Sequence, residues 1–338
     1  MKLALRVLEA LQPMKLKVAV IYGGRSGEHE VSVRSARAIM DRMDPAKYDI
    51  AEFFIDQQGK WSPRPILPEP GAHPDIDVVF PVLHGTFGED GTMQGLLELA
   101  DLPYVGAGVM ASAVSMDKEM MKRVCAERML PIVDYLTVTR ETADAAAIAQ
   151  RFPFPMFVKP ANLGSSVGIS KAHNLAELET ALVEAAKFDR KIIVERGIEG
   201  RELECSVLGN ENPVASTPCE ILPSREFYDY DDKYLLDLAQ TQVPADLDAA
   251  TTEELRRLAV ECYRAVECEG MGRVDFLLEA ATGKLYINEI NTIPGFTSIS
   301  MYPKMWEHSG IGFAELIDRL IEFSLARHKR KKATRFTR

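Results

Sequence analysis

Four polar residues near the carboxyl end of the chain have types and spacing that could hold a metal ion. Arg273 and Asp275 lie in one apolar run and Glu289 and Asn291 in the next, and the runs flank a glycine-containing loop at residues 281–283. This pattern predicts a β-hairpin in which position 275 pairs with 289 and 273 with 291. Because opposed residues share a face and strand side chains alternate, all four would project to the same side.

Crowded carboxylates repel one another, and burying them costs free energy unless a cation compensates. Mg²⁺ prefers oxygen ligands, and its coordination is usually completed by waters and substrate phosphates. An Asp, Glu and Asn set therefore predicts a magnesium site. The alternative is a surface hairpin with solvated acids, but Leu277, Leu278, Leu285 and Ile287 indicate that both faces are at least partly covered.

Bulk properties exclude several classes of protein. With 338 residues the chain is long enough for two or three domains, and its formal charge of -10 argues against a nucleic-acid-binding body. The five cysteines form no CxxC pair, which indicates buried thiols in a reducing compartment. No apolar run approaches membrane-spanning length, and residues 1–13 lack a secretory cleavage site. We therefore expect a cytoplasmic protein without membrane or nucleic-acid partners.

The elements that must position the site begin with an α/β unit. A β-rich run, residues 15–22, ends in Gly23-Gly24 and precedes a helical pattern at residues 31–43. Glu28 lies at the entrance of this helix, where a carboxylate would repel an anion and suit an ammonium group. The alternative is an ordinary first-turn acid that complements the helix dipole.

Two further segments of this first half contain weaker motifs. Residues 105–111 match a GxGxxA dinucleotide fingerprint as a string, but they do not follow the first strand of a βαβ unit. A Rossmann oxidoreductase is therefore disfavoured. The glycine-rich loop at residues 84–91 begins with His84, which is interpreted as a structural histidine rather than a catalytic base.

A glycine-serine loop that contains Ser165 and Ser166 follows the strand at residues 156–160. Such a loop between two strands can direct N–H groups and hydroxyls at phosphate oxygens. Lys118 and Lys159 lie nearby in the chain, and each is either a point charge for a phosphate or a solvated surface residue.

Acidic residues follow at the end of the next strand. Glu195 ends the apolar run at residues 191–195, where it could accept a hydrogen bond from an adenine amine, and Glu202 could reach ribose hydroxyls. Both are also explained as ordinary strand-end acids. Periodicity then fails across residues 222–247, and a structured loop of this length is typical of a lid.

These segments together resemble the ATP-grasp superfamily and, within it, the D-alanine–D-alanine ligases. The resemblance spans roughly residues 15–325 in the family's order. The matching strings are GGRSGEHEVSVRSA, LHGTFGEDGTMQG, GVMASAVSMDK, VKPANLGSSVGISK, FYDYDDKY, GRVDFLLE and INEINTIPGFTSIS. Each string is weakly or moderately specific, and the set is very specific.

The resemblance implies an α/β fold, α+β in parts, with three domains. An N-terminal Rossmann-like (pre-ATP-grasp) domain would span residues 14–115, and the two ATP-grasp subdomains residues 116–203 and 204–328. The second subdomain would include a lid at about residues 222–243, and residues 1–13 and 329–338 would be flexible termini. The run of basic residues after Ala326 is most simply a disordered solvated end, with binding to an anionic surface as the alternative. A homodimer is implied.

By this resemblance ATP binds between the central and C-terminal subdomains. Lys118, Lys159 and Ser166 would hold its phosphates, and Glu195 and Glu202 its adenine and ribose. Asp275, Glu289 and Asn291 would hold two Mg²⁺ ions, with Mn²⁺ as a possible substitute. The γ-phosphoryl group would pass to the carboxylate of one D-alanine, and the amine of a second would attack the acyl phosphate.

The resemblance also assigns the residues around the amino acids. Glu28 would receive the ammonium of the first D-alanine and connect through Ser165 to Tyr234 on the lid, whose closure excludes water. Arg273 and the N–H of Gly295 would form an oxyanion hole. Lys233 and Ser300 would bind the second carboxylate.

Subclass depends on fewer residues. Tyr234 favours a dipeptide product, whereas Met301 departs from the leucine common in dipeptide ligases, so a D-alanyl-D-lactate or D-alanyl-D-serine product stays an alternative. A non-catalytic nucleotide-binding module of the same fold is a further alternative. Such a module would be expected to have lost Arg273 or part of the metal set, and the sequence retains them.

Overall fold

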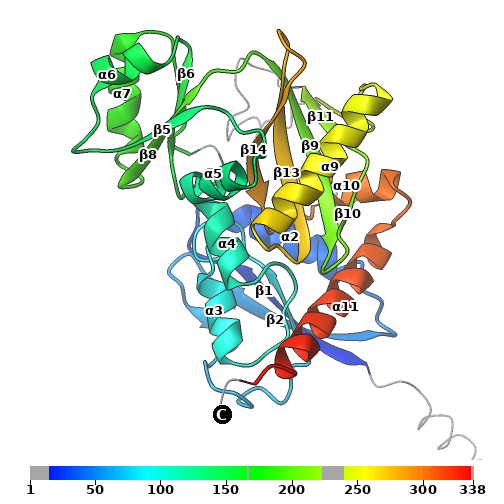
Figure 1. Cartoon of the computed structure of the whole chain (residues 1–338). Helices are drawn as coiled ribbons and strands as arrows, with labels where there is room; N and C mark the ends of the chain where they lie inside the picture. The colour runs from blue at the N-terminus through cyan, green and yellow to red at the C-terminus, as the bar shows by residue number, and fades with distance from the viewer. Residues whose placement is uncertain (1–14, 166, 223–239, 298, 336–338) are drawn as a thin grey trace, which may run out of the picture.

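The structure is a computed structural model that describes residues 15–165, 167–222, 240–297 and 299–335. Its strands form three β-sheets, one in each of the N-terminal, central and C-terminal parts of the chain. Figure 1 shows the N-terminal sheet lowest, with the other two side by side above it. The predicted mixed α/β architecture is confirmed.

The N-terminal sheet has the strand order β3-β2-β1-β4, with β1 parallel to both β2 and β4. Its strands are β1 (Leu16–Gly23), β2 (Tyr48–Ile55), β3 (Trp61–Ser62) and β4 (Val78–Val82), and its helices are α2 (His29–Met40), α3 (Thr92–Leu99) and α4 (Val109–Met116). Every residue of β4 is buried, as expected for a parallel strand that is covered on both faces. β2 is added on one side of β1 and β4 on the other, so the loops after β1 and β4 meet at a switch point of the strand order, where such folds bind ligands.

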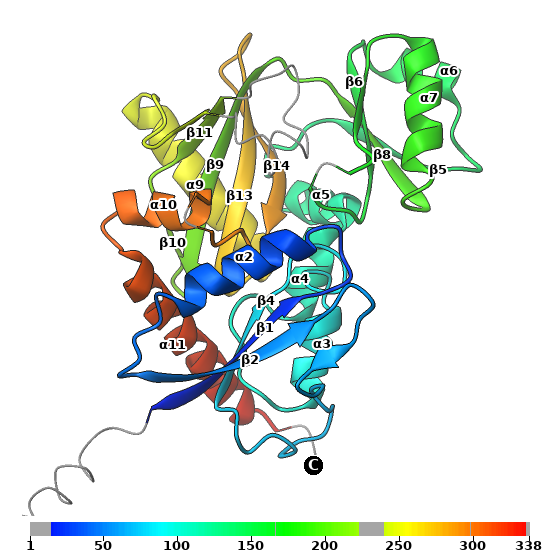
Figure 2. The same cartoon turned by 180° about the vertical axis from the view of Figure 1, so that it is seen from behind.

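Helices from the end of the chain complete the core of this first sheet. α10 (Met301–His308) and α11 (Phe313–Lys332) contribute Tyr302, Trp306 and Leu316 to one apolar cluster with Val20 of β1. The ring of Phe296 packs edge-on against Phe80 of β4 at a centroid distance of 6.3 Å. Figure 2 shows α11 beside β1 and β2. The two ends of the chain therefore share one core.

The central sheet is antiparallel, with the order β5-β8-β6-β7. Its elements are β5 (Tyr135–Thr139), α6 (Ala145–Arg151), β6 (Met156–Pro160), β7 (Ser170–Ala172), α7 (Leu175–Ala185) and β8 (Lys191–Arg196). Asn174 caps α7 by accepting a hydrogen bond from the N–H of Glu177. The predicted glycine-serine loop connects β6 to β7.

The C-terminal sheet has the order β12-β11-β9-β13-β14, with β10 beside β9. Its strands are β9 (Gly200–Gly209), β10 (Val214–Ala215), β11 (Cys219–Leu222), β12 (Gln240–Gln242), β13 (Gly270–Glu279) and β14 (Leu285–Asn291). One face packs against α9 (Ala249–Ala265) and α5 (Lys118–Glu127). Asp248 caps α9 by accepting a hydrogen bond from the N–H of Thr251. The boundary predicted between residues 203 and 204 falls inside β9, so the structural division lies near Gly200.

The basic carboxyl end differs from the prediction of a solvated tail. Helix α11 continues to Lys332, and its basic side chains pair with acids from both neighbouring domains. Arg330 contacts Glu211 and Glu269, while Lys331 contacts Glu98 of α3. These partners are distant in sequence, so the tail's order depends on tertiary contacts.

Two bulk expectations also have structural counterparts. The five cysteines are free and buried. No helix in the described ranges is both long enough and apolar enough to cross a bilayer.

Candidate active site

The predicted metal-binding hairpin forms with the expected pairs. Arg273 lies opposite Asn291, and Asp275 lies opposite Glu289. Arg273 donates two hydrogen bonds of 2.7 Å to the Asp275 carboxylate, and Asn291 Nδ2 donates to Asp275 Oδ2 at 3.0 Å. Glu204 on β9 lies on the other side of Asp275, with Oε2 at 3.3 Å from Arg273 Nε. Arg273, Asp275 and Asn291 therefore share one face, as predicted.

The guanidinium of Arg273 is the positive centre of this face. Burial disfavours its charge, but the carboxylates of Asp275 and Glu204 outweigh that effect and hold the pKa of Arg273 well above its ordinary value. The side chain is therefore a fixed cation. An oxyanion that developed next to it would be stabilised.

A β-bulge in β14 changes which residues face the site. Phe276 pairs with Ile287 and Asp275 with Glu289, so Asn288 is an extra residue in β14. The loop is correspondingly one residue longer than predicted, because Glu279 N donates to Lys284 O. Under strict alternation the side chains of Asn288 and Glu289 would point to opposite faces of the sheet. With the bulge, Leu285, Ile287 and Ile290 all enter the core cluster of the sheet's other face.

The two predicted phosphate-binding lysines approach these consecutive bulge residues. Lys118 Nζ lies 3.3 Å from Glu289 Oε2 and donates to Leu163 O at 2.8 Å. Lys159 Nζ donates to Asn288 Oδ1 at 3.2 Å. Both lysines are buried. They are not solvated surface residues, and they connect the central sheet to the C-terminal sheet.

Glu195 has a different setting from the one predicted. Its Oε2 lies 2.6 Å from Lys159 Nζ, and its Oε1 lies 2.7 Å from the ammonium of Lys122. Burial raises the pKa of Glu195, but the two ammonium groups outweigh this and lower it to about 2. Both oxygens thus have lysine partners, so an adenine amine would have to share them. Burial lowers the pKa of Lys159, but the carboxylate of Glu195, followed by those of Glu289 and Glu202, outweighs this and raises it.

Glu28 lies where three loops meet. Ser165 Oγ donates a hydrogen bond to Glu28 Oε1, which confirms the predicted contact between the N-terminal domain and the glycine-serine loop. Ser165 has a φ of 52°, so the loop turns sharply at this residue. A Cβ at Gly85 would lie 2.4 Å from Glu28 Oε2, so only glycine allows this approach.

The loop after β4 anchors the N-terminal domain to the segment after β14. His84 is buried, and its ring nitrogens lie 2.9 Å from Ile293 O and 3.1 Å from Ser35 Oγ. Glu89 accepts hydrogen bonds from the N–H groups of Gly85 and Ile293, at 2.6 and 3.0 Å. Burial and the charge of Glu28 raise the pKa of Glu89 to about 8. The structural interpretation of His84 agrees with these contacts.

The structure describes only some of the remaining predicted site residues. Ser300 Oγ accepts a hydrogen bond of 2.9 Å from Thr297 N, and a Cβ at Gly295 would lie 2.9 Å from that oxygen. Gly295 and Ser300 are therefore neighbours. Ser166, Lys233 and Tyr234 lie outside the described residues, as does most of the predicted lid.

Three residues near the site were not predicted from the sequence. Lys122 follows Lys118 by one helical turn, and this spacing alone would have placed both on one face of α5. Glu204 follows Glu202 by two residues, which is the repeat of a strand face. Asn288 had no comparable signal, because its orientation depends on the bulge.

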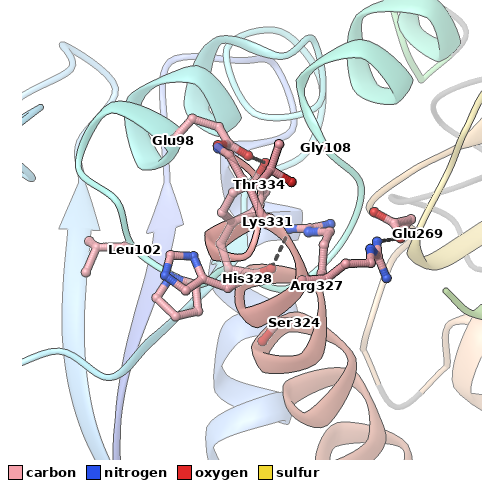
Figure 3. Close-up of a pocket in the computed structure, with 12 residues that line it drawn as sticks. Glu98, Leu102, Gly108, Glu269, Ser324, Arg327, His328, Lys331 and Thr334 are labelled. Carbon is pink, nitrogen blue, oxygen red and sulfur yellow. Dashed lines mark hydrogen bonds and ion pairs between the residues drawn. The ribbon is translucent and has the colours of Figure 1, made fainter. Parts of the chain in front are cut away.

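A separate cavity of about 270 Å³ lies between α11 and the α3–α4 region, and Figure 3 shows the residues around it. Arg327 donates to the carbonyl oxygens of Tyr104 and Gly106 there. Arg330 and Lys331 are paired with acids, as described above. The cavity contains none of the predicted site residues, so it is not the candidate active site.

The three sheets, with buried lysines facing an acidic hairpin, define an ATP-grasp protein. A solved D-alanine–D-alanine ligase from Coxiella burnetii is similar over 95% of this chain and 97% of that one, with 39% identity and a TM-score of 0.86. Family models described as the D-ala D-ala ligase C-terminus and N-terminus match residues 124–322, and 17–73 and 67–107. The chain belongs to the D-alanine–D-alanine ligase family.

Two further relatives within that family are similar to this chain over most of its length. A D-alanine–D-alanine ligase from Solibacter usitatus is 78% identical over 96% of this chain and all of the relative. The solved VanG D-Ala:D-Ser ligase from Enterococcus faecalis is 34% identical over 92% of this chain and all of that one, with a TM-score of 0.84. The family and the first relative establish D-alanine–D-alanine ligase activity, which serves peptidoglycan synthesis.

Proposed function

We propose that the enzyme uses ATP and Mg²⁺ at the junction of the central and C-terminal sheets, and that the reaction proceeds through D-alanyl phosphate. The observation that carries this proposal is the approach of Lys118 and Lys159 to consecutive residues of the β14 bulge. Two fixed cations opposite an oxygen-rich strand suit a metal-bound triphosphate.

The donor set at the hairpin fits magnesium. No group of three or more His, Cys, Asp or Glu side chains among the described residues is arranged to hold a metal ion. A cation held by Asp275, Glu289 and Asn291 would therefore take further ligands from phosphate oxygens and water, which is the usual coordination of Mg²⁺. When bound, the metal neutralises the charge of the phosphates during transfer.

The protein groups around the two amino acids then have distinct roles. Glu28 attracts the ammonium of the first D-alanine, and Ser165 fixes the orientation of that carboxylate. Arg273 and the N–H of Gly295 stabilise the tetrahedral oxyanion formed when the second amine attacks the acyl phosphate. Ser300, with Lys233, binds the carboxylate of the second D-alanine. Glu202 contributes to the ribose contact.

The test is D-alanine-dependent phosphate release from ATP. We expect release to require both D-alanine and Mg²⁺, with Mn²⁺ as an active substitute. Phosphate release that does not change when chelator removes the metal would contradict the magnesium assignment. ATP-independent dipeptide formation would contradict the acyl phosphate route.

We further infer that D-alanine is the preferred second substrate, although the similar solved VanG enzyme is a D-Ala:D-Ser ligase. Met301 packs in a small apolar cluster, with its Sδ 3.4 Å from Cys219 Sγ. A product assay that offers D-alanine together with D-serine or D-lactate tests this preference. Mostly mixed product near neutral pH would overturn it.

We also propose a cytoplasmic homodimer. Free buried cysteines support a reducing compartment, and the family resemblance supports the dimer. Light scattering after size exclusion should give about twice the chain mass of 37.6 kDa. A monomeric mass at micromolar concentration would contradict the dimer.

A further inference from the structure

Lys122 is a buried cation for which the reaction described above has no role. It lies on α5, its exposure is 0%, and its ammonium is paired with Glu195. Glu195 in turn pairs with Lys159, so one carboxylate lies between two ammonium groups. We propose that Lys122 is a positioning residue for nucleotide binding, which acts through Glu195 on Lys159. This inference rests on the proposed binding of ATP phosphates by Lys159.

The charges of these three residues support the proposal. Lys159 and Glu195 alone would form a neutral ion pair, and a neutral pair attracts phosphate weakly. With Lys122 included, two positive charges face one negative charge and the group carries a net positive charge. Glu195 can then orient Lys159 without cancelling its attraction for phosphate.

The geometry shows why Lys122 and not solvent must supply this charge. Its Nζ lies 5.6 Å from the centroid of the Tyr135 ring, and the aromatic face covers the ammonium from the side of β5. Lys159 extends from the same carboxylate toward Asn288 on the neighbouring sheet. Burial makes the position of each group depend on its charged partner. Lys122 therefore fixes the position of Glu195, and Glu195 in turn fixes the direction in which the Lys159 side chain points.

A second lysine near α5 provides a matched control. Lys191 Nζ bridges Asp117 and Glu119, at 2.6 Å from each carboxylate. It resembles Lys122 in residue type and in pairing with acids, although it has two acidic partners where Lys122 has Glu195, and neither of the two is a predicted site residue. Lys191→Met should therefore alter stability without a specific effect on ATP.

The experiment compares Lys122→Met, Lys122→Gln and Lys122→Arg with Lys191→Met in the full-length enzyme. ATP affinity is measured by calorimetry without D-alanine, and KM for ATP and for D-alanine by phosphate release. We expect the Met and Gln variants to lose about tenfold in ATP affinity, the loss typical of removing one charged hydrogen-bond partner. KM for D-alanine should change less than twofold, and Lys122→Arg should restore most of the ATP affinity.

Several results would overturn the proposal. One is a folded Lys122→Gln variant whose ATP affinity is within twofold of the parent. Another is an equal loss in Lys191→Met. If neither neutral variant folds while Lys122→Arg does, the charge is required for the fold and the positioning role is wrong. Failure of the parent enzyme to bind ATP would instead refute the proposed function.

Discussion

Replacing Glu195 with glutamine should remove a specific part of the pH dependence of stability. In the parent enzyme the carboxylate lies between the ammonium groups of Lys122 and Lys159, which lower its pKa from 4.5 to about 2 despite burial. A carboxyl group with a lowered pKa in the folded state stabilises the fold above its unfolded pKa. That contribution is lost as the pH falls from 4.5 towards 2.

The size of the effect follows from the two pKa values. At about 1.4 kcal/mol for each pH unit, the difference between 4.5 and about 2 corresponds to about 3 kcal/mol at neutral pH. Glutamine has no charge to lose. The free-energy difference between the parent and Glu195→Gln should therefore be about 3 kcal/mol at pH 6 and smaller by about 2 kcal/mol at pH 3.

Urea unfolding followed by circular dichroism at pH 6 and pH 3 measures this difference. Glu220→Gln is a matched control, because Glu220 lies in the neighbouring sheet and pairs with Arg201, which is partly exposed. A gap between the parent and Glu195→Gln that stays constant from pH 6 to pH 3 would refute the reasoning. An NMR titration that placed the Glu195 pKa near 4.5 would refute it directly.

Three further perturbations address other parts of the structure. Arg273→Ala should raise the barrier by about 3 kcal/mol, measured as turnover in phosphate release, and near-normal turnover would exclude the oxyanion role. Deleting Asn288 should remove the bulge and leave a regular ladder in which Phe276 still pairs with Ile287 and Asp275 with Glu289, so the apolar residues keep their core face and folded protein is expected. Asn288→Ala should likewise keep the parent circular dichroism spectrum, and both variants should raise KM for ATP because both remove the contact to Lys159; failure of the deletion variant to fold would contradict this account of the bulge. Arg330→Glu should lower the melting temperature by a few degrees, about 1 kcal/mol, with a smaller effect at 1 M salt. An effect independent of salt would indicate lost packing instead.

The sequence predicted the hairpin because its signals are local. Alternation, a glycine-containing loop and opposed polar residues are enough to place Arg273 opposite Asn291 and Asp275 opposite Glu289. The bulge could not be predicted in this way, because an extra residue leaves the same letters in the same order. Its cause is the packing of Ile287 and Ile290 on one core face, which is a tertiary requirement.

The setting of Glu195 was missed for a related reason. A strand-end acid was an adequate description from the sequence, but its partners come from α5 and β6, elements far apart in the chain. The carboxyl end of α11 is a similar case, since its acidic partners lie in other domains. Long-range charge pairs of this kind have no sequence spacing from which they could be recognised.

The arrangement of charges at the junction explains how one site can suit both a metal and a triphosphate. Lys118 of α5 contacts Glu289, and Lys159 of the central sheet contacts Asn288, so two cations face oxygen atoms from the C-terminal sheet. A magnesium–phosphate group also carries a positive and a negative part, with the metal as the cation and the phosphate oxygens as the anion. Its metal suits the hairpin oxygens, and its phosphate oxygens suit the lysines. The bulge directs two consecutive residues, Asn288 and Glu289, at two lysines. A magnesium–phosphate group that entered there could therefore replace the lysine contacts of the strand with metal contacts, and the strand contacts of the lysines with phosphate contacts.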